Sequence, residues 1–258
     1  MKLLAFDTST DQLSVAVTDG ARFWQHGGPG GAKASATLIP AVMALLAEAG
    51  LTLAELDAIA FGVGPGSFTG LRTACAVAQG LAFGARRPVL PVDTLLAVAE
   101  EARHGHGAER VVTVLDARMD EMYTNRYAWR AGSWEAEADF ALVRPEALEV
   151  PAGWTLAGNA MPVYGERFPP RPHDGGALPP DVAALPVAAA MLRLAPALLA
   201  AGGAVDPSHA LPRYIRDKVA QTTAERLVVR QAAADAAAAL AATAGIAANV
   251  PGQAKVAP

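Results

Sequence analysis

The sequence predicts an α/β fold made of two similar halves. Strand-like and helix-like segments alternate along the first hundred residues, and the strand-and-turn pattern that opens the chain returns in its second half. The length of 258 residues suits one large domain or two modest ones. With 52% apolar residues and a net charge of −4, the composition indicates a globular chain and argues against a strongly basic nucleic-acid surface.

Three strands are expected first. The apolar run Leu3–Phe6 ends at the turn formers Asp7–Thr10, the segment Leu13–Val17 alternates apolar with polar residues, and Arg22–Gln25 follows a second turn. The first two strands are therefore joined by a hydroxyl-rich hairpin. Because His26–Lys33 contains four glycines and a proline, we expect it to be a loop.

Helices and strands then alternate. A helix is expected from Ser35 to Gly50, because the apolar residues of this segment fall on one helical face. Those residues are Leu38, Val42, Leu45, Leu46 and Ala49. Next come a strand at Ala58–Val63, a helix through Leu81, a strand at Val89–Val92 and a helix at Thr94–Arg103. This order indicates a sheet with helices on its faces.

The second half repeats the opening. An apolar strand, Asp7, three residues and Asp11 are matched by the strand Val111–Leu115, Asp116, three residues and Asp120, with an alternating strand after each. We interpret this as duplication, although any strand–turn–strand can use Asp at its bend. A proline-rich loop after residue 159 and a helix at 182–199, kinked or split by its second proline, complete this half. The predicted domains are 1–104 and 108–226.

The last segment, 227–258, is an alanine-rich tail that carries 14 of the 60 alanines, and we expect frayed helix or disorder there. No leader or membrane-spanning segment is predicted. The single Cys75 excludes an internal disulfide framework and suits a reducing cytoplasm.

Two segments could hold an anion. The hairpin residues Asp7, Thr8, Ser9 and Thr10 place a carboxylate and three hydroxyls at a strand end, where a phosphate or ion could bind. A turn that satisfies its own backbone is the simpler interpretation, and we favour it. The second segment is the glycine loop between a strand and a helix. Its candidate residues are Gly64, Gly66, Ser67, Thr69, Gly70 and Arg72.

The glycine loop matches none of three well-known motifs. It lacks the lysine of a Walker loop, the final spacing of a Rossmann fingerprint and the G-x-S-x-G pattern of a nucleophilic serine. Amides at the helix start suit an anion, but a tight turn in which Ser67 or Thr69 caps the helix is at least as well supported.

The remaining polar residues do not assemble into a catalytic set. The second-half turn contains Asp116, Arg118, Asp120 and Glu121, which could form a carboxylate cluster or simply a solvated bend. No histidine pair has metal-ligand spacing on a helix, and His104 and His106 are expected in an exposed loop. We predict no metal site.

Four motifs make the chain resemble the TsaB family, also known as YeaZ. They are FDTST at Phe6–Thr10, GVGPGSFTGLR at Gly62–Arg72, VLDARMDEMY at Val114–Tyr123 and PRYIRDKVAQTTAE at Pro212–Glu225. The resemblance spans residues 1–226 and leaves the alanine-rich tail outside. It implies two βββαβα domains of the actin/Hsp70-like (ASKHA, ribonuclease H-like) fold, the last helix packing back on the first domain.

The resemblance also implies a function. The family supports TsaD in transferring a threonylcarbamoyl group to N6 of adenosine 37 in ANN-decoding tRNAs, and helps form a site for the ATPase TsaE. This chain lacks the H-x-x-x-H metal pair of TsaD, so the implied role is non-catalytic, and the older label of M22 glycoprotease does not fit. The implied state is a heterodimer with TsaD, or a homodimer in isolation, without a cofactor unless ATP or ADP binds in the complex.

Two positions depart from the pattern. Ala34 stands where such chains often have His, and Ser9 stands where ATPase hairpins usually have Gly. A side chain at position 9 hinders close approach of a phosphate, which makes independent nucleotide binding doubtful.

The resemblance implies that the helices at Ser35–Ala49 and Leu71–Phe83 form the partner face. The predicted residues of this face are Leu38, Val42, Leu45, Thr73, Ala76 and Gly80. Small residues would let a partner helix approach, but the same face could equally pack on the chain's own sheet. On this expectation, Leu45→Glu or Ala76→Arg prevents association and leaves the monomer folded. The alternatives are an ATP-dependent small-molecule kinase of the same fold and a peptidase.

Overall fold

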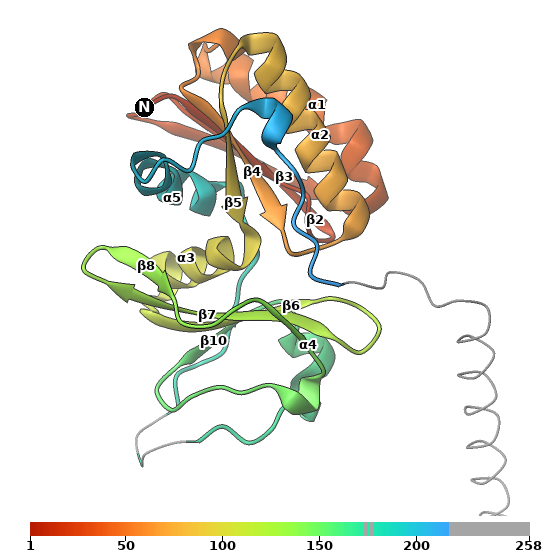
Figure 1. Cartoon of the computed structure of the whole chain (residues 1–258), viewed down its shortest axis with the longest axis vertical. Coiled ribbons are helices and arrows are strands. Elements are labelled where there is room, and N and C mark those ends of the chain that lie inside the picture. Colours follow the sequence, from red (N-terminus) through yellow and green to blue (C-terminus); the bar gives the residue numbers. More distant parts are fainter. Residues whose placement is uncertain (173–174, 176–177, 217–258) are drawn as a thin grey trace, which may run out of the picture. The chain divides into compact units, whose positions relative to one another are not determined.

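The first sheet is formed by the first 93 residues (Figure 1). The computed structural model describes residues 1–172, 175 and 178–216. Strand order in this sheet is β3-β2-β1-β4-β5, with β1 antiparallel to β2 and parallel to β4. The strands are β1 (Leu3–Asp7), β2 (Gln12–Thr18), β3 (Phe23–Pro29), β4 (Ala58–Gly64) and β5 (Val89–Asp93).

The second sheet repeats this topology. Its order is β11-β10-β6-β7-β8, and β6 is antiparallel to β7 and parallel to β10, as β1 is to β2 and β4. The duplicated α/β organisation is thereby confirmed. The strands are β6 (Arg110–Asp116), β7 (Met122–Arg130), β8 (Ser133–Ala136), β10 (Thr155–Gly158) and β11 (Val182–Ala183), and β9 (Ala141–Val143) also pairs with β7.

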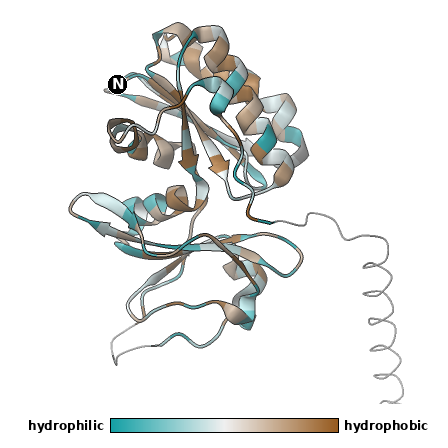
Figure 2. Cartoon of the chain, in the orientation of Figure 1, coloured by the Kyte–Doolittle hydropathy of each residue, from teal (hydrophilic) through white to brown (hydrophobic). Residues whose placement is uncertain are grey.

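Four helices of three turns or more surround the first sheet. Helices α1 (Ala34–Ala49) and α2 (Phe68–Ala85) cover one face, and α3 (Thr94–His106) and α5 (Ala188–Ala200) pack against the other. Figure 2 shows the apolar character of β4 and β5 between these layers. Helix α3 also contributes to the core on the second sheet, so it lies between the two sheets.

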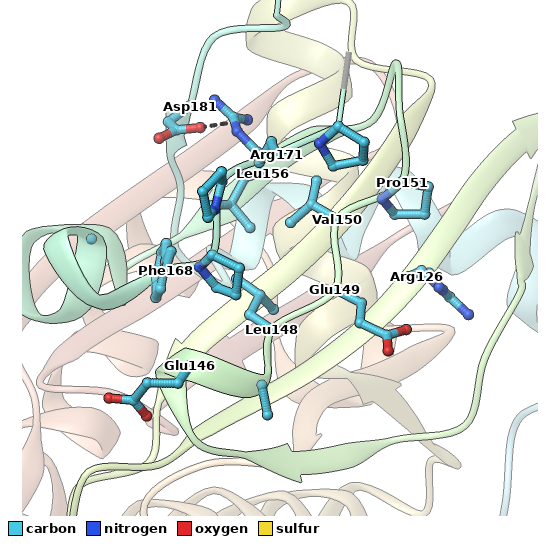
Figure 3. A pocket seen from close by; sticks show the side chains of 15 residues that line it. Arg126, Glu146, Leu148, Glu149, Val150, Pro151, Leu156, Phe168, Arg171 and Asp181 are labelled. Carbon is cyan, nitrogen blue, oxygen red and sulfur yellow. Dashed lines mark ion pairs between the residues drawn. The ribbon is translucent and has the colours of Figure 1, made fainter. Parts of the chain in front are cut away.

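The outer face of the second sheet has much thinner cover. Its described cover consists of short turns, loops and the one-turn helix α4 (Met161–Tyr164). A pocket of about 670 Å³ opens there over Leu148, Val150 and Leu156, with prolines at its wall (Figure 3). Arg171 at its rim pairs with Asp181 at 2.9 Å.

Several sequence expectations were wrong. The segment 26–29 is strand rather than loop, because its backbone pairs with β2 from Val15 to Gln12 and glycine does not prevent edge pairing. His104 and His106 are exposed as predicted, but they lie in the last turn of α3, which ends at Gly107 in the left-handed conformation. The strands β8, β9 and β10 were not predicted from the sequence.

The predicted helix at 182–199 also needs correction. Residues Val182–Ala183 form β11 instead, and α5 begins at Ala188, after Pro186. Pro196 lies inside α5 and does not split it. The tail predicted at 227–258 lies outside the described residues.

A C-terminal strap (residues 205–215) returns to the first sheet. Val205 pairs with Val89, the carbonyl of Ala210 accepts hydrogen bonds from Cys75 Sγ and Gln79 Nε2, and the amide of Arg213 donates to Val63 at 2.7 Å. Residues 211–216 have no regular secondary structure, and the helix expected up to Ala224 falls outside the described residues from position 217. Within the described part of the chain, no helix has the length and apolarity needed to cross a membrane.

Candidate functional site

The structure brings the predicted hairpin and glycine loop into direct contact. The amide of Ser67 donates to the carbonyl of Ser9 at 2.7 Å, and Thr8 Oγ1 donates to the carbonyl of Gly70 at 2.7 Å. Thr8 and Ser9 are buried, whereas Ser67 and Thr69 are exposed and Thr10 is half-buried. Ser67 directly precedes α2 in the capping position but makes no side-chain cap bond. The two segments predicted separately form one closed unit.

Glycines make this contact possible. A Cβ at Gly70 would lie 1.8 Å from the carbonyl oxygen of Thr8, and a Cβ at Gly66 would lie 2.6 Å from Cβ of Ser9. Gly64 has a φ of 118°, and a Cβ there would lie 2.6 Å from the carbonyl oxygen of Arg213 in the strap. The loop glycines are therefore explained by close backbone packing within the chain.

Asp7 is buried at the end of β1. Its Oδ1 accepts hydrogen bonds from the amide of Ser9 at 2.8 Å and from Ser9 Oγ at 2.7 Å, which is the self-satisfied turn favoured above. Its Oδ2 has no hydrogen-bond partner in the described part of the chain. A Cβ added at Gly62 would lie only 1.8 Å from this oxygen. Burial raises the pKa of Asp7 to about 7, against the lowering effect of the bonds from Ser9.

We expect Asp7→Asn to stabilise the protein increasingly as the pH rises. Asp7 has a pKa near 7 when folded and near 3.8 when unfolded, so its contribution to stability is full below about pH 4 and declines up to about pH 7. Asparagine does not ionise, so the variant keeps its stability over this pH range. Its advantage in free energy of unfolding should grow by about 2–3 kcal/mol between pH 5 and pH 8, as measured by urea titration. An advantage independent of pH would contradict the assignment.

The turn of the second half repeats the first. Asp116 Oδ1 accepts from the amide of Arg118 at 2.8 Å, as Asp7 accepts from Ser9, and Tyr164 Oη also donates to it at 3.0 Å. Residues 118–120 all have positive φ, between 57° and 61°, in the left-handed region that side chains other than glycine seldom adopt. This turn is strained in a way that its sequence did not indicate.

Arginines connect the acidic residues of the two turns. Arg118 pairs with Asp116 at 3.0 Å and with Asp11 in the first hairpin, while Arg167 pairs with Asp120 at 2.9 Å. The carbonyl of Glu121 accepts from the amide of Ala117. No metal-binding group of three or more His, Cys, Asp or Glu occurs among the described residues. Asp116 and Asp120 of this turn are thus held in ion pairs, and the pair between Arg118 and Asp11 joins equivalent turns of the two halves.

The predicted partner face divides between core and surface. Leu38, Val42 and Leu45 are at most 5% exposed and belong to the chain's own core, so they are not available to a partner. Leu45→Glu would therefore disrupt folding, contrary to the expectation above. Ala76 and Gly80 are exposed and Thr73 is half-buried.

Three apolar side chains on the outer side of these helices were missed. Ile39 and Met43 of α1 are 45% and 49% exposed, and Phe83 of α2 is 79% exposed. The spacing of Ile39 and Met43 by four residues could have revealed them, because they fall outside the stripe that the core residues occupy. With Ala76 and Gly80 they form what we call the outer face of α1 and α2.

An aromatic and arginine cluster lies at the start of α2. The guanidinium of Arg72 lies 3.7 Å from the ring centre of Phe68, and its Nε donates to Tyr214 Oη at 2.9 Å. The Phe68 and Tyr214 rings are 5.3 Å apart. The sequence placed Arg72 at the glycine loop but could not show its partner on the strap, which is 142 residues away.

Comparison with known proteins gives consistent matches. The family model described as "TsaD: tRNA N6-adenosine threonylcarbamoyltransferase" matches residues 31–257. The protein TsaB of Escherichia coli is 35% identical over 229 residues, which cover 85% of this chain and 96% of that protein. TsaB of Haemophilus influenzae is 45% identical over 123 residues, covering 48% of this chain and 52% of that protein.

A solved structure agrees with these matches. YeaZ from Pseudomonas aeruginosa superposes with a TM-score of 0.75 at 42% sequence identity, and the match covers 83% of this chain and 99% of that one. Fold, topology and sequence therefore point to the same group of proteins. The chain belongs to the TsaB family, also called YeaZ.

Proposed function

We propose that this chain is a non-catalytic subunit in the cytoplasmic biosynthesis of threonylcarbamoyladenosine in tRNA. In this role it pairs with TsaD and supports transfer of the threonylcarbamoyl group to N6 of adenosine 37 in ANN-decoding tRNAs, and the pair helps to form a site for TsaE. The observation that carries the proposal is the nearly end-to-end match to TsaB of E. coli, a protein named for this pathway.

The closed hairpin supports a non-catalytic role. In this chain the hydroxyl of Thr8 and the amide of Ser67, groups that could otherwise contact a phosphate, bind the chain's own backbone. Ser9 lies against Gly66, which leaves the hairpin in contact with the loop. We therefore propose that the lone chain uses no cofactor and that ATP or ADP binds only in the complex with TsaD.

The outer face of α1 and α2 suits a helical partner. It combines the exposed apolar side chains of Ile39, Met43 and Phe83 with the small residues Ala76 and Gly80, over which another helix can approach closely. We propose that this face contacts TsaD in the complex and a second copy of the chain in isolation.

Ala76→Arg should abolish association with TsaD and leave the monomer folded. Position 76 is exposed, so an arginine disturbs no core contact but blocks the approach of a partner helix. Ala197→Arg is the matched control, because Ala197 is an exposed position on α5, which packs on the opposite face of the first sheet. Size-exclusion co-elution with TsaD measures association, and the same runs without TsaD report the homodimer.

Co-elution of Ala76→Arg equal to that of the control variant would rule out this face. The biological role is tested by asking whether the chain restores the tRNA modification in cells that lack their own TsaB. Isothermal titration with ATP, first without and then with TsaD, separates a supporting subunit from a kinase. Saturable ATP binding and turnover by the lone chain would favour the kinase.

A further inference from the structure

A second, smaller cavity lies between the end of β5, the strands β7 and β8, and the strap. Its volume is about 290 Å³, close to the lower end of the range of small-molecule sites, about 300–1,000 Å³. The lining comes from three separate parts of the chain: the start of α3, the second sheet with the segment after β8, and Arg213 of the strap. It is distinct from the hairpin, the glycine loop and the outer face of α1 and α2.

One wall of this cavity is polar and held by hydrogen bonds. The hydroxyl of Tyr127 donates to Asp93 Oδ2, and Asn125 Nδ2 donates to the same hydroxyl at 3.1 Å. Asp93 Oδ1 accepts from the amide of Leu95 at 2.8 Å, which caps α3. Burial raises the pKa of Asp93 to about 6, although the hydrogen bond from Tyr127 acts to lower it. Asp93 thus keeps a negative potential at this wall near neutral pH.

Aromatic rings form the other walls. Trp134 meets the ring of Tyr127 edge-on with 6.5 Å between centres, and its indole N–H is already used by Glu100. The guanidinium of Arg213 lies 4.8 Å from the ring centre of Phe140, a cation–π contact that holds it at the cavity. Rings of this kind accept apolar groups.

Two opposite charges at the cavity have no direct ion pair in the described part of the chain, although the positive charge of Arg213 acts on Asp93 to lower its pKa. Among the described residues, neither Arg213 nor Asp139 forms an ion pair or a side-chain hydrogen bond, and they are not paired with each other. Both are exposed, so they are accessible from solvent. A cation and an anion beside an aromatic wall are complementary to a small molecule that carries one group of each sign and an apolar part.

We propose that this cavity binds a free α-amino acid, whose carboxylate pairs with Arg213 and whose ammonium group pairs with Asp139. The side chain of the amino acid lies against the rings of Tyr127, Trp134 and Phe140, which favours apolar side chains over charged ones. The site is independent of the proposed role in tRNA modification.

Titration calorimetry of the full chain with each proteinogenic amino acid tests this site. At least one apolar amino acid should bind with a Kd of about 0.1–1 mM, as expected for a small ligand held by two charge pairs. Arg213→Gln and Asp139→Asn should each weaken binding about tenfold. The matched controls Arg144→Gln and Glu149→Gln change exposed charges outside this cavity and should bind as the wild type does.

Two further measurements do not depend on removing a charge from the protein. The methyl ester of the best ligand lacks the carboxylate and its N-acetyl form lacks the ammonium, so both should bind the wild type at least about tenfold more weakly. Ala138→Phe should abolish binding by filling the cavity. Absence of saturable binding up to about 10 mM, or equal binding by the ester and by both charge variants, would overturn the proposal.

Discussion

Glu100→Gln is expected to lower the free energy of unfolding by about 2–3 kcal/mol. Glu100 lies on α3 and is 1% exposed. Its carboxylate accepts hydrogen bonds from Arg103 Nε at 3.0 Å, Arg193 Nε at 3.0 Å and Trp134 Nε1 at 3.0 Å. Removing the charge leaves two arginines that are about three-quarters buried without their main partner, a change that destabilises proteins strongly.

The position of these partners explains why the effect should be global. Arg103 shares α3 with Glu100, Arg193 comes from α5 on the first sheet, and Trp134 comes from β8 of the second sheet. One buried carboxylate therefore connects elements of both sheets. Its loss should lower the unfolding midpoint seen by far-ultraviolet circular dichroism and by tryptophan fluorescence together.

Glu101→Gln is the matched control for Glu100→Gln. Glu101 is 34% exposed and, within the part of the chain that the structure describes, its one ion pair is with Arg193, so its loss should cost less than about 1 kcal/mol. Equal effects of the two variants would show that the buried carboxylate is not the stabilising element. Burial acts to raise the pKa of Glu100, but the bonds from Arg103 and Trp134 outweigh it and leave the pKa lowered. The contribution of Glu100 is therefore present above its unfolded pKa and is lost as the pH falls below it.

Local patterns in the sequence were sufficient for most of the fold. Apolar periodicity and turn residues predict the strands β1, β2, β4, β6 and β7 and the helices α1, α2 and α3. The repeat of Asp7 and Asp11 in Asp116 and Asp120 predicted the duplicated topology. In the structure Asp7 and Asp116 each accept a hydrogen bond from the amide two residues later.

The errors have a common physical cause in contacts between segments, which the pattern within one segment does not show. The glycine-rich strand β3 is ordered by backbone pairing with β2, which does not depend on its side chains. Leu38 and Leu45 fit a core stripe and a partner face equally well on a helical projection, and only their packing under the first sheet decides between the two. Arg213 at its cavity and Tyr214 at Arg72 depend on where the strap returns, which no local pattern encodes.

The hairpin and the glycine loop were each predicted from the sequence, but the contact between them was not. Each segment was visible alone, yet nothing local showed that Thr8 lies against Gly70. This contact explains why the loop has glycine even at positions whose backbone angles other residues could adopt. Gly70 has a helical position in the first turn of α2, and its lack of a side chain serves the approach of another segment.

Gly70→Ala should therefore be strongly destabilising, by about 3 kcal/mol or more in the free energy of unfolding. The added Cβ would lie 1.8 Å from the carbonyl oxygen of Thr8 and 2.9 Å from its carbonyl carbon, so backbone must move. Such a shift separates the hairpin from α2 and breaks the bonds that Thr8 Oγ1 and the amide of Ser67 make across the contact.

Gly80→Ala supplies a control in the same helix with the opposite expected sign. Nothing lies within 4 Å of the added Cβ at Gly80, and alanine in a helix interior is favoured over glycine by about 0.5–1 kcal/mol. Urea unfolding of both variants thus separates helix propensity, which should raise stability at both positions, from the steric contact, which exists only at Gly70. If Gly70→Ala were as stable as Gly80→Ala, the hairpin would not be held against the loop in solution, and the support that the closed hairpin gives to a non-catalytic role would be lost.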